Sequence, residues 1–120
     1  MDILLVDDDK WIRDSVTLLF EAEGCRCRAV ETAEQALEEL AGKKVDIVIA
    51  DYRLARMDGL ELLGRIQRSH PRSMKVLVTA YGDRRICAEA RRLGVREVLE
   101  KPLTAEALRS SLERLVDIAA

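Results

Sequence analysis

The chain has 120 residues, the size of one ordinary domain. Apolar residues make up 48% and aromatic residues only 3%, so the composition is that of a globular protein with an aliphatic core. The net charge of −2 provides no positive field for nucleic acid, and we expect no direct nucleic-acid binding. There is no apolar stretch long enough to span a bilayer and no leader, which predicts a cytoplasmic protein without membrane association. The three cysteines lack metal-ligand spacing and are expected to be free thiols.

Strand and helix patterns alternate through the first half of the chain. A short apolar strand over 2–6 precedes a helix over 10–23, and a weaker strand over 25–30 follows. Apolar positions of that weaker strand alternate with arginines, which is typical of a strand at the edge of a sheet. A capping box opens a helix that runs from 32 to 42, and the apolar run over 45–50 predicts a buried strand.

The same alternation continues to the last residues. A helix begins at Gly59 and stops at His70, which is expected to be a solvated terminator because a proline follows it. Strands over 75–78 and 95–99 flank an arginine-rich fourth helix, and a fifth helix follows. Strands that alternate with helices in this way predict an α/β domain with a parallel sheet.

Polar side chains with shared chemistry follow the ends of the central strands. Two acids follow the first strand, and an acid, a threonine and a lysine follow the third, fourth and fifth: Asp7, Asp8, Asp51, Thr79 and Lys101. The carboxyl ends of parallel strands meet at one edge of the sheet, where ligands bind. Three carboxylates suit Mg²⁺, and a lysine with a hydroxyl group suits a phosphoryl group. The set predicts a site that moves a phosphoryl group onto Asp51 and off again.

Over its full length the sequence resembles the receiver domains of two-component response regulators. The matching segments are ILLVDDD at 3–9, the acid at 51, MDGLELL at 57–63, TAYGD at 79–83 and EKPL at 100–103. The last two are most similar to receivers of the nitrogen-regulation type, whose effectors are often transcription activators. The resemblance implies a (βα)5 flavodoxin-like fold with a doubly wound parallel sheet of strand order 2-1-3-4-5. It also implies a single receiver domain over 1–120, either complete or the N-terminal part of a longer response regulator.

The resemblance further implies how the acidic residues act. Asp51 would accept a phosphoryl group from the phosphohistidine of a sensor histidine kinase or a phosphotransfer protein. Mg²⁺, or Mn²⁺ in its place, would be held by the side chains of Asp7, Asp8 and Asp51 and by the backbone carbonyl of Arg53.

The remaining residues of the motif have roles in binding and switching. Lys101 would pair with a phosphoryl oxygen, Thr79 would move inward to hydrogen-bond another, and Pro102 would follow Lys101 across a cis peptide bond. Such a protein is a slowly dephosphorylating switch and not a turnover enzyme. It would control an effector domain or a downstream protein, with a transcriptional output expected.

Several positions depart from the family pattern. Ala55 and Arg56 stand where receivers usually have Pro-Gly, which predicts a less rigid and more basic loop. Val98 replaces the usual aromatic switch residue, and we interpret Tyr81 as taking over part of its coupling to the threonine. Arg53 and Tyr81 are both large and flank the path of the attacking water in this family, which predicts slow loss of the phosphate.

Other prominent side chains have structural interpretations or a role in assembly. Asp9 and Asp58 precede helices and are expected to cap them. Trp11 is expected to pack against the domain. The arginines of the fourth helix are either a solvated face or, with acids of the last helix, half of a two-fold dimer contact through helix 4, strand 5 and helix 5. The residues concerned are Arg84, Arg85, Arg91, Arg92, Glu106 and Glu113.

Two other functions compete with the phosphorylation switch. A pseudo-receiver would keep the fold and act as a phosphorylation-independent protein interaction module, as Val98 and the missing Pro-Gly allow. A metal-dependent phosphatase of related topology would need a second acid at Arg53 and a cap domain, and the chain has neither.

Overall fold

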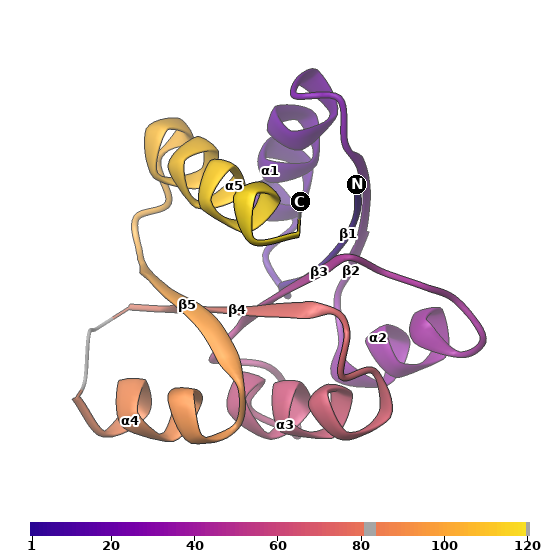
Figure 1. Cartoon of the computed structure of the whole chain (residues 1–120), viewed down its shortest axis with the longest axis vertical. Coiled ribbons are helices and arrows are strands. Elements are labelled where there is room, and N and C mark those ends of the chain that lie inside the picture. Colours follow the sequence, from indigo (N-terminus) through magenta and orange to yellow (C-terminus); the bar gives the residue numbers. More distant parts are fainter. Residues whose placement is uncertain (81–83, 120) are drawn as a thin grey trace.

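The structure is a computed structural model that describes residues 1–80 and 84–119. Within this part of the chain, five parallel strands form one sheet in the order β2-β1-β3-β4-β5, with helices on both faces (Figure 1). The strands are β1 (Asp2–Val6), β2 (Arg26–Val30), β3 (Ile47–Asp51), β4 (Met74–Thr79) and β5 (Val95–Glu100). The helices are α1 (Lys10–Ala22), α2 (Ala33–Leu40), α3 (Gly59–Ser69), α4 (Arg84–Arg92) and α5 (Ala105–Ala119). The predicted fold class and strand order are confirmed.

Successive side chains of the strands point to opposite faces of the sheet and divide the apolar core into two layers. Ile3 and Ile49 lie on the face covered by α1 and α5, while Leu4 and Val48 lie on the face covered by α2, α3 and α4 (Figure 1). Both layers are aliphatic, and Phe20 of α1 is a buried aromatic of the first layer. Because successive side chains of a strand point to opposite faces, this double burial determines the register of the central strands.

Side-chain caps place the first residues of the helices that follow the acidic strand ends. Asp9 accepts hydrogen bonds from the amides of Trp11 and Ile12 and caps α1. Asp58 accepts from the amide of Glu61 and caps α3. Both acids are therefore caps, as predicted, and α1 and α3 begin close to the carboxyl edge of the sheet.

The boundaries of several predicted elements were wrong, most of them by one or two residues; β4, for example, includes Thr79, which was expected to follow it. β3 begins at Ile47 and ends at Asp51, so Asp51 is the last residue of the strand and not the first residue after it. Its pairing with Val78 of β4 extends the strand through the acid. α2 ends at Leu40, two residues before Gly42, and the Leu40 carbonyl accepts a hydrogen bond from His70 Nε2 at 3.0 Å.

His70 is a helix terminator, as predicted, but the prediction of a solvated side chain was wrong. His70 is the C-cap residue of α3, and its ring is half-buried between α2 and α3. Nδ1 contacts the Ser69 hydroxyl at 2.8 Å while Nε2 bonds the last carbonyl of α2. His70 therefore joins the ends of two helices on the same face of the sheet.

Lys75 at the start of β4 is fully buried. Its Nζ donates to the carbonyl oxygens of His70 at 2.6 Å and Ser73 at 2.7 Å. Burial disfavours the ammonium form and lowers the pKa of Lys75 to about 8. The lysine thus closes the loop before β4 at the edge of the sheet opposite the acidic strand ends.

No helix in the described ranges is long and apolar enough to cross a membrane.

Candidate functional site

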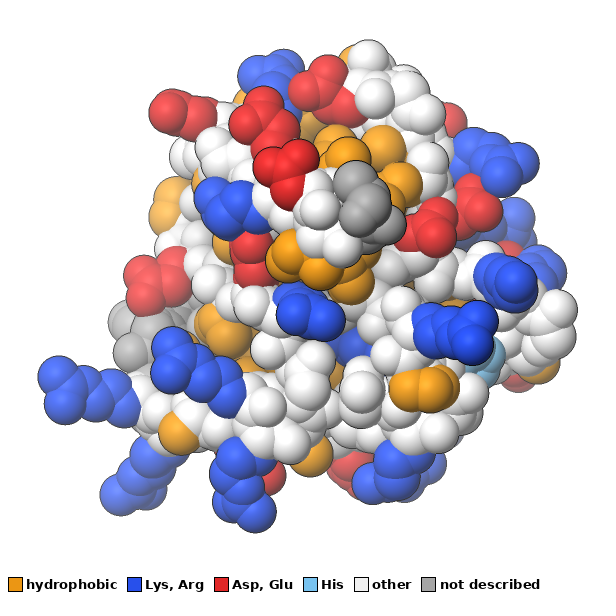
Figure 2. Space-filling model, in the orientation of Figure 1, with side chains coloured by type: hydrophobic (Ala, Val, Ile, Leu, Met, Phe, Trp, Pro, Cys, Tyr) orange, Lys and Arg blue, Asp and Glu red, His pale blue; other side chains and the backbone are white. Residues whose placement is uncertain are grey.

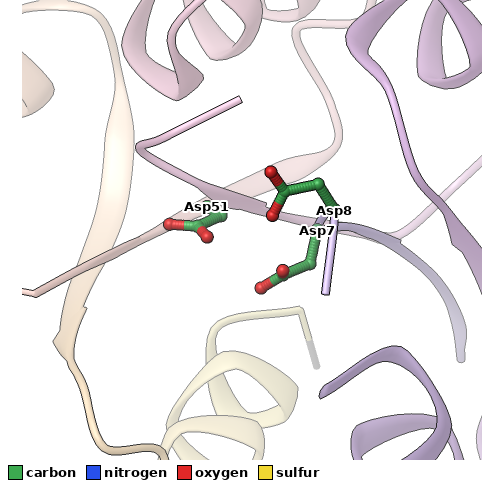
Figure 3. A group of neighbouring side chains, drawn as sticks. All are labelled: Asp7, Asp8 and Asp51. Atoms are coloured by element: carbon green, nitrogen blue, oxygen red, sulfur yellow. The ribbon is translucent and has the colours of Figure 1, made fainter. Parts of the chain in front are cut away.

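Three carboxylates converge at the carboxyl edge of the sheet. Asp7 and Asp8 follow β1, and Asp51 ends β3 beside it; one oxygen from each of the three side chains lies within 4.8 Å of the others (Figure 3). Asp7 and Asp51 are buried, with 2% and 5% of their surfaces exposed, whereas Asp8 is exposed. The sequence prediction that these acids meet is confirmed, and the exposed Asp8 leaves the cluster open to solvent.

Lys101 provides the positive charge of this site. Its Nζ lies 2.8 Å from Asp51 Oδ2, and its backbone amide donates to the Thr79 carbonyl at 2.9 Å. Burial lowers the pKa of Lys101, but the hydrogen bond to Asp51 and the charges of the acids outweigh it, so the pKa is raised above its usual value. The lysine is therefore held as an ammonium group against Asp51. The peptide bond between Lys101 and Pro102 is cis, as the resemblance implies.

Thr79 stands on the strand between Asp51 and Lys101. It is the last residue of β4, only 4% of its surface is exposed, and it pairs with Glu100 of β5. The backbone of β4 thus brings a hydroxyl group to the same edge as the acids and the lysine.

The Asp7 carboxylate is oriented by a hydrogen bond within its own turn and is repelled by the neighbouring acids. Its Oδ1 accepts a hydrogen bond from the Asp9 amide at 2.9 Å. Burial raises the pKa of Asp7, the charges of Asp51 and Asp8 raise it further, and the Asp9 amide and Lys101 oppose this effect. A hard divalent cation would relieve the repulsion among these acids. The oxygen donor set therefore fits Mg²⁺.

Sequence reasoning assigned no role at the site to two residues that support it. Gly59 opens α3 directly against the peptide that follows Asp51, and its amide donates to the Tyr52 carbonyl at 2.8 Å. A Cβ at Gly59 would overlap the Asp51 carbonyl group, at 2.9 Å from its carbon. The second is Arg13, whose Nη1 donates to the Asp7 carbonyl at 2.8 Å. The sequence signal for this contact is the spacing of six residues between Asp7 and Arg13, which places the arginine in the first turns of α1.

The loop after Asp51 is largely exposed and carries two arginines, Arg53 and Arg56, while its lower rigidity stays a prediction. The Arg53 amide donates to Asp51 Oδ1 at 3.3 Å while its side chain is exposed. Arg56 is a non-glycine residue with a positive φ, of 70°. Arg56 stands where receivers usually have the glycine of a Pro-Gly pair. Glycine suits that position because it adopts a positive φ without steric cost.

The predicted switch residues have different outcomes. Val98 is half-buried and packs against the core layer formed with α2, α3 and α4. Tyr81 lies outside the described residues.

Trp11 was expected to pack against the domain, but 79% of its surface is exposed, beside a groove that Lys101 and Pro102 also line.

Known proteins share both this sequence pattern and this fold. The family model of the response regulator receiver domain matches residues 3–113. The chain belongs to the response regulator receiver domain family. This receiver domain is 35% identical over 118 residues to the nitrogen assimilation regulatory protein NtrX of Azorhizobium caulinodans. It is 32% identical over 114 residues to the DNA-binding transcriptional regulator NtrC of Escherichia coli K12, and 31% identical over 114 residues to the transcriptional regulatory protein FixJ of Bradyrhizobium diazoefficiens.

Solved structures agree with these relatives. The structure of NtrX from Brucella abortus in complex with ADP superposes with a TM-score of 0.89 at 34% identity, over 98% of this chain and 27% of that one. A CheY-like receiver domain protein from Methanospirillum hungatei superposes with a TM-score of 0.90 at 28% identity, over 97% of this chain and 94% of that one.

The chain spans only part of the curated relatives. It aligns over 97% of its own length with 26% of NtrX, over 95% with 24% of NtrC and over 95% with 56% of FixJ. Receiver domains of two-component response regulators are signalling switches, and these relatives are regulators, two of them named as transcriptional.

Replacing Arg56 with Gly is expected to stabilise the receiver domain by about 0.5 to 1 kcal/mol. The left-handed conformation strains an arginine and not a glycine, and this gain exceeds the added entropy of the unfolded chain. Urea unfolding of both proteins measures the difference. Ala55→Gly is the matched control and should destabilise the domain, because Ala55 is not in the left-handed region. Equal effects of the two substitutions would contradict the prediction.

Proposed function

We propose that this receiver domain is a phosphorylation-controlled switch in which Asp51 accepts a phosphoryl group from a phosphohistidine. The observation that carries the proposal is the joint placement of the buried Asp51, the Lys101 ammonium group 2.8 Å away and the neighbouring acids Asp7 and Asp8. A cation pocket, a nucleophilic carboxylate and a fixed positive charge are the parts that phosphoryl transfer requires.

The proposed phosphoryl transfer is a balanced reaction between the phosphohistidine of the donor and the Asp51 carboxylate. A carboxylate oxygen of Asp51 attacks phosphorus, the bond from phosphorus to the donor nitrogen breaks, and the donor imidazole takes up one proton. An acyl phosphate remains on Asp51. Water later attacks the same phosphorus, releases inorganic phosphate and regenerates the carboxylate.

Each neighbour of Asp51 contributes to this chemistry. Bound Mg²⁺, held by Asp7, Asp8, Asp51 and the Arg53 carbonyl, would neutralise charge on the carboxylates and on the phosphoryl oxygens. Lys101 moves from its pair with Asp51 to a phosphoryl oxygen, which requires only that the oxygen replaces Oδ2 as its partner. The exposed side chain of Arg53 restricts access of water and slows dephosphorylation.

Phosphorylation then changes the populations of two conformations. Thr79 bonds a phosphoryl oxygen from the end of β4, and this bond biases the loop that leads to α4. Val98 packs beneath α4 on the same face of the sheet, where an aromatic switch residue usually stands. Tyr81 takes part of that role in the proposed relay.

The partners follow from the same proposal. The donor is a sensor histidine kinase or a phosphotransfer protein, and the output is an effector domain or a downstream protein, with a role in transcription. In this proposal residues 1–120 are the N-terminal receiver of a longer, cytoplasmic regulator. The greater lengths of NtrX and NtrC, of which the chain covers 26% and 24%, support a longer protein.

The chemistry can be tested with a small acyl phosphate. Acetyl phosphate with Mg²⁺ is expected to add one phosphoryl group to the wild type and none to Asp51→Asn, as measured by intact mass. Asp58→Asn is the matched control, since asparagine caps α3 as well as aspartate does, and it should react like the wild type. A wild type that binds Mg²⁺ but never gains phosphate would favour the pseudo-receiver.

Mg²⁺ is expected to raise the melting temperature by about 5 °C at ten times its dissociation constant, equivalent to roughly 1.4 kcal/mol. Because burial raises the pKa of Asp7 above its unfolded value, ionising this acid costs folding free energy as pH rises through the folded pKa. Mg²⁺ offsets that cost and competes with the proton, so its effect should be larger at neutral pH than at about pH 5. Thermal unfolding across this range measures it.

Two variants separate the metal site from general charge effects. Asp7→Asn should raise the melting temperature without Mg²⁺ and abolish the response to Mg²⁺. Asp9→Asn keeps the cap of α1 and should retain the response. An unchanged response in Asp7→Asn would exclude this residue as a ligand.

The proposal includes a two-fold dimer through α4, β5 and α5. Basic side chains project from the α4 corner and acidic side chains gather over α5 in Figure 2. Arg84 and Arg91 are exposed on α4, and Glu106 and Glu113 are exposed on α5. Opposite charges on the two helices that precede and follow β5 make a surface that is complementary to a rotated copy of itself.

Beryllofluoride, which mimics the phosphoryl group, is expected to promote this dimer, and salt should weaken it because its charges are exposed. Arg91→Glu should weaken dimerisation several-fold in sedimentation experiments. Lys44→Glu changes an exposed charge before β3, far from α4 in sequence, and should not. A dimer that is insensitive to salt and to Arg91→Glu would rule out this surface.

A further inference from the structure

The peptide between Asp7 and Asp8 lies where the ladder between β1 and β2 stops. The Asp7 amide donates to the Val30 carbonyl at 3.1 Å, one step beyond the last paired residues. In a parallel ladder the next bond would run from the amide two residues after Val30, that of Thr32, to the Asp7 carbonyl. That amide is directed elsewhere.

The capping box of α2 takes the donor that the ladder needs. Gln35 Oε1 accepts from the Thr32 amide at 3.2 Å and from the Glu31 amide at 2.8 Å, while the Thr32 hydroxyl accepts from the Gln35 amide. The start of α2 is thereby stabilised. The carbonyl of Asp7 is left at the end of the sheet without its regular backbone donor.

Arg13 supplies a replacement donor from α1. Its half-buried guanidinium reaches back to the Asp7 carbonyl, with Nη1 2.8 Å from the oxygen, a length typical of a charge-assisted hydrogen bond. The backbone of Arg13 is held in α1 by its own bond to the Asp9 carbonyl at 3.0 Å. The loop between β1 and α1 is therefore clamped at its first peptide.

This clamp acts on the geometry of the acidic cluster. The plane of the Asp7–Asp8 peptide sets the directions in which both side chains leave the backbone, and the Asp9 amide then orients the Asp7 carboxylate at 2.9 Å. Arg13 bonds the backbone carbonyl of Asp7 and not its carboxylate, so this contact acts on the orientation of the peptide.

We infer that Arg13 is a positioning residue for cation binding, because its guanidinium replaces the ladder amide of Thr32 at the Asp7 carbonyl and holds Asp7 and Asp8 convergent. The inference rests on the proposed function of this site. Loss of such a supporting hydrogen bond typically weakens metal affinity about 10-fold or more. Arg13→Ala should therefore weaken Mg²⁺ binding about 10-fold.

The experiment measures Mg²⁺ affinity of the full chain by calorimetric titration and by the Mg²⁺ dependence of the melting temperature. Acetyl phosphate reactions at varied Mg²⁺ provide a second readout. In Arg13→Ala the Mg²⁺ concentration for half-maximal rate should rise about 10-fold, while the rate at saturating Mg²⁺ changes much less. Arg13→Lys restores a cationic donor and should lie between the wild type and Arg13→Ala.

Two further variants separate this role from a general effect on α1 and α2. Lys10→Ala removes an exposed residue of α1 that pairs with Asp14 and should leave Mg²⁺ affinity unchanged. Gln35→Ala frees the Thr32 amide to bond the Asp7 carbonyl, so Arg13→Ala should lose less affinity in that background. An equal loss in both backgrounds would contradict the displaced-ladder explanation.

The outcomes distinguish this inference from the proposed function. Mg²⁺ affinity of Arg13→Ala within twofold of the wild type overturns the inference, provided that the wild type binds Mg²⁺ and accepts phosphate. A wild type that does neither overturns the proposed function itself. If Arg13→Ala does not fold, Arg13→Gln decides, because its shorter amide does not reach the Asp7 carbonyl: unchanged affinity overturns the inference and a comparable loss supports it.

Discussion

Repulsion among like charges at the carboxyl edge of the sheet is the constraint around which this domain is organised. Asp7, Asp8 and Asp51 bring three carboxylate oxygens within 4.8 Å, and two of these side chains are buried. Lys101 pairs with Asp51 at 2.8 Å and offsets part of that repulsion. The remainder is a cost to folding that the rest of the molecule must exceed. A bound cation would remove this repulsion.

Backbone bonds hold the acids in this unfavourable arrangement. The Asp7 amide continues the β1 ladder onto Val30, the Tyr52 amide bonds the Val78 carbonyl just after Asp51, and the Lys101 amide bonds the Thr79 carbonyl. Each bond lies at or one step beyond a strand end. The two aliphatic layers stabilise the strands, and the strands in turn fix the polar edge. Stability and function are therefore separated in space, with the core supplying the free energy that the site consumes.

Two departures from the usual receiver pattern lie outside the set of Asp51, Lys101 and Thr79. Arg56 adopts a left-handed conformation in the loop before α3, and Val98 presents an aliphatic side chain to the layer beneath α4. Asp51, Lys101 and Thr79 keep their places at the edge.

Periodicity, caps and turn residues were sufficient to predict the parallel sheet, the order of elements and the meeting of the acids with Lys101 and Thr79. These features depend on local patterns and on one topological rule, that parallel strands end at a common edge. The end of β3 at Asp51 depended instead on pairing with Val78. The bond from the Leu40 carbonyl at the end of α2 to the ring of His70, which is distant in sequence, also forms only in the folded domain. The sequence pattern also did not predict the complete burial of Lys75 or the exposure of Trp11.

Arg13 illustrates the physical reason for this division. The residues themselves determined that α1 would begin near the acids, because Asp9 caps it. Only the tertiary structure decided that an arginine of α1 would bond the Asp7 carbonyl, since that bond arises from a donor diverted to α2 by Gln35. Local sequence encodes periodicity and capping, whereas competition for one backbone hydrogen bond among three elements exists only after they have packed together.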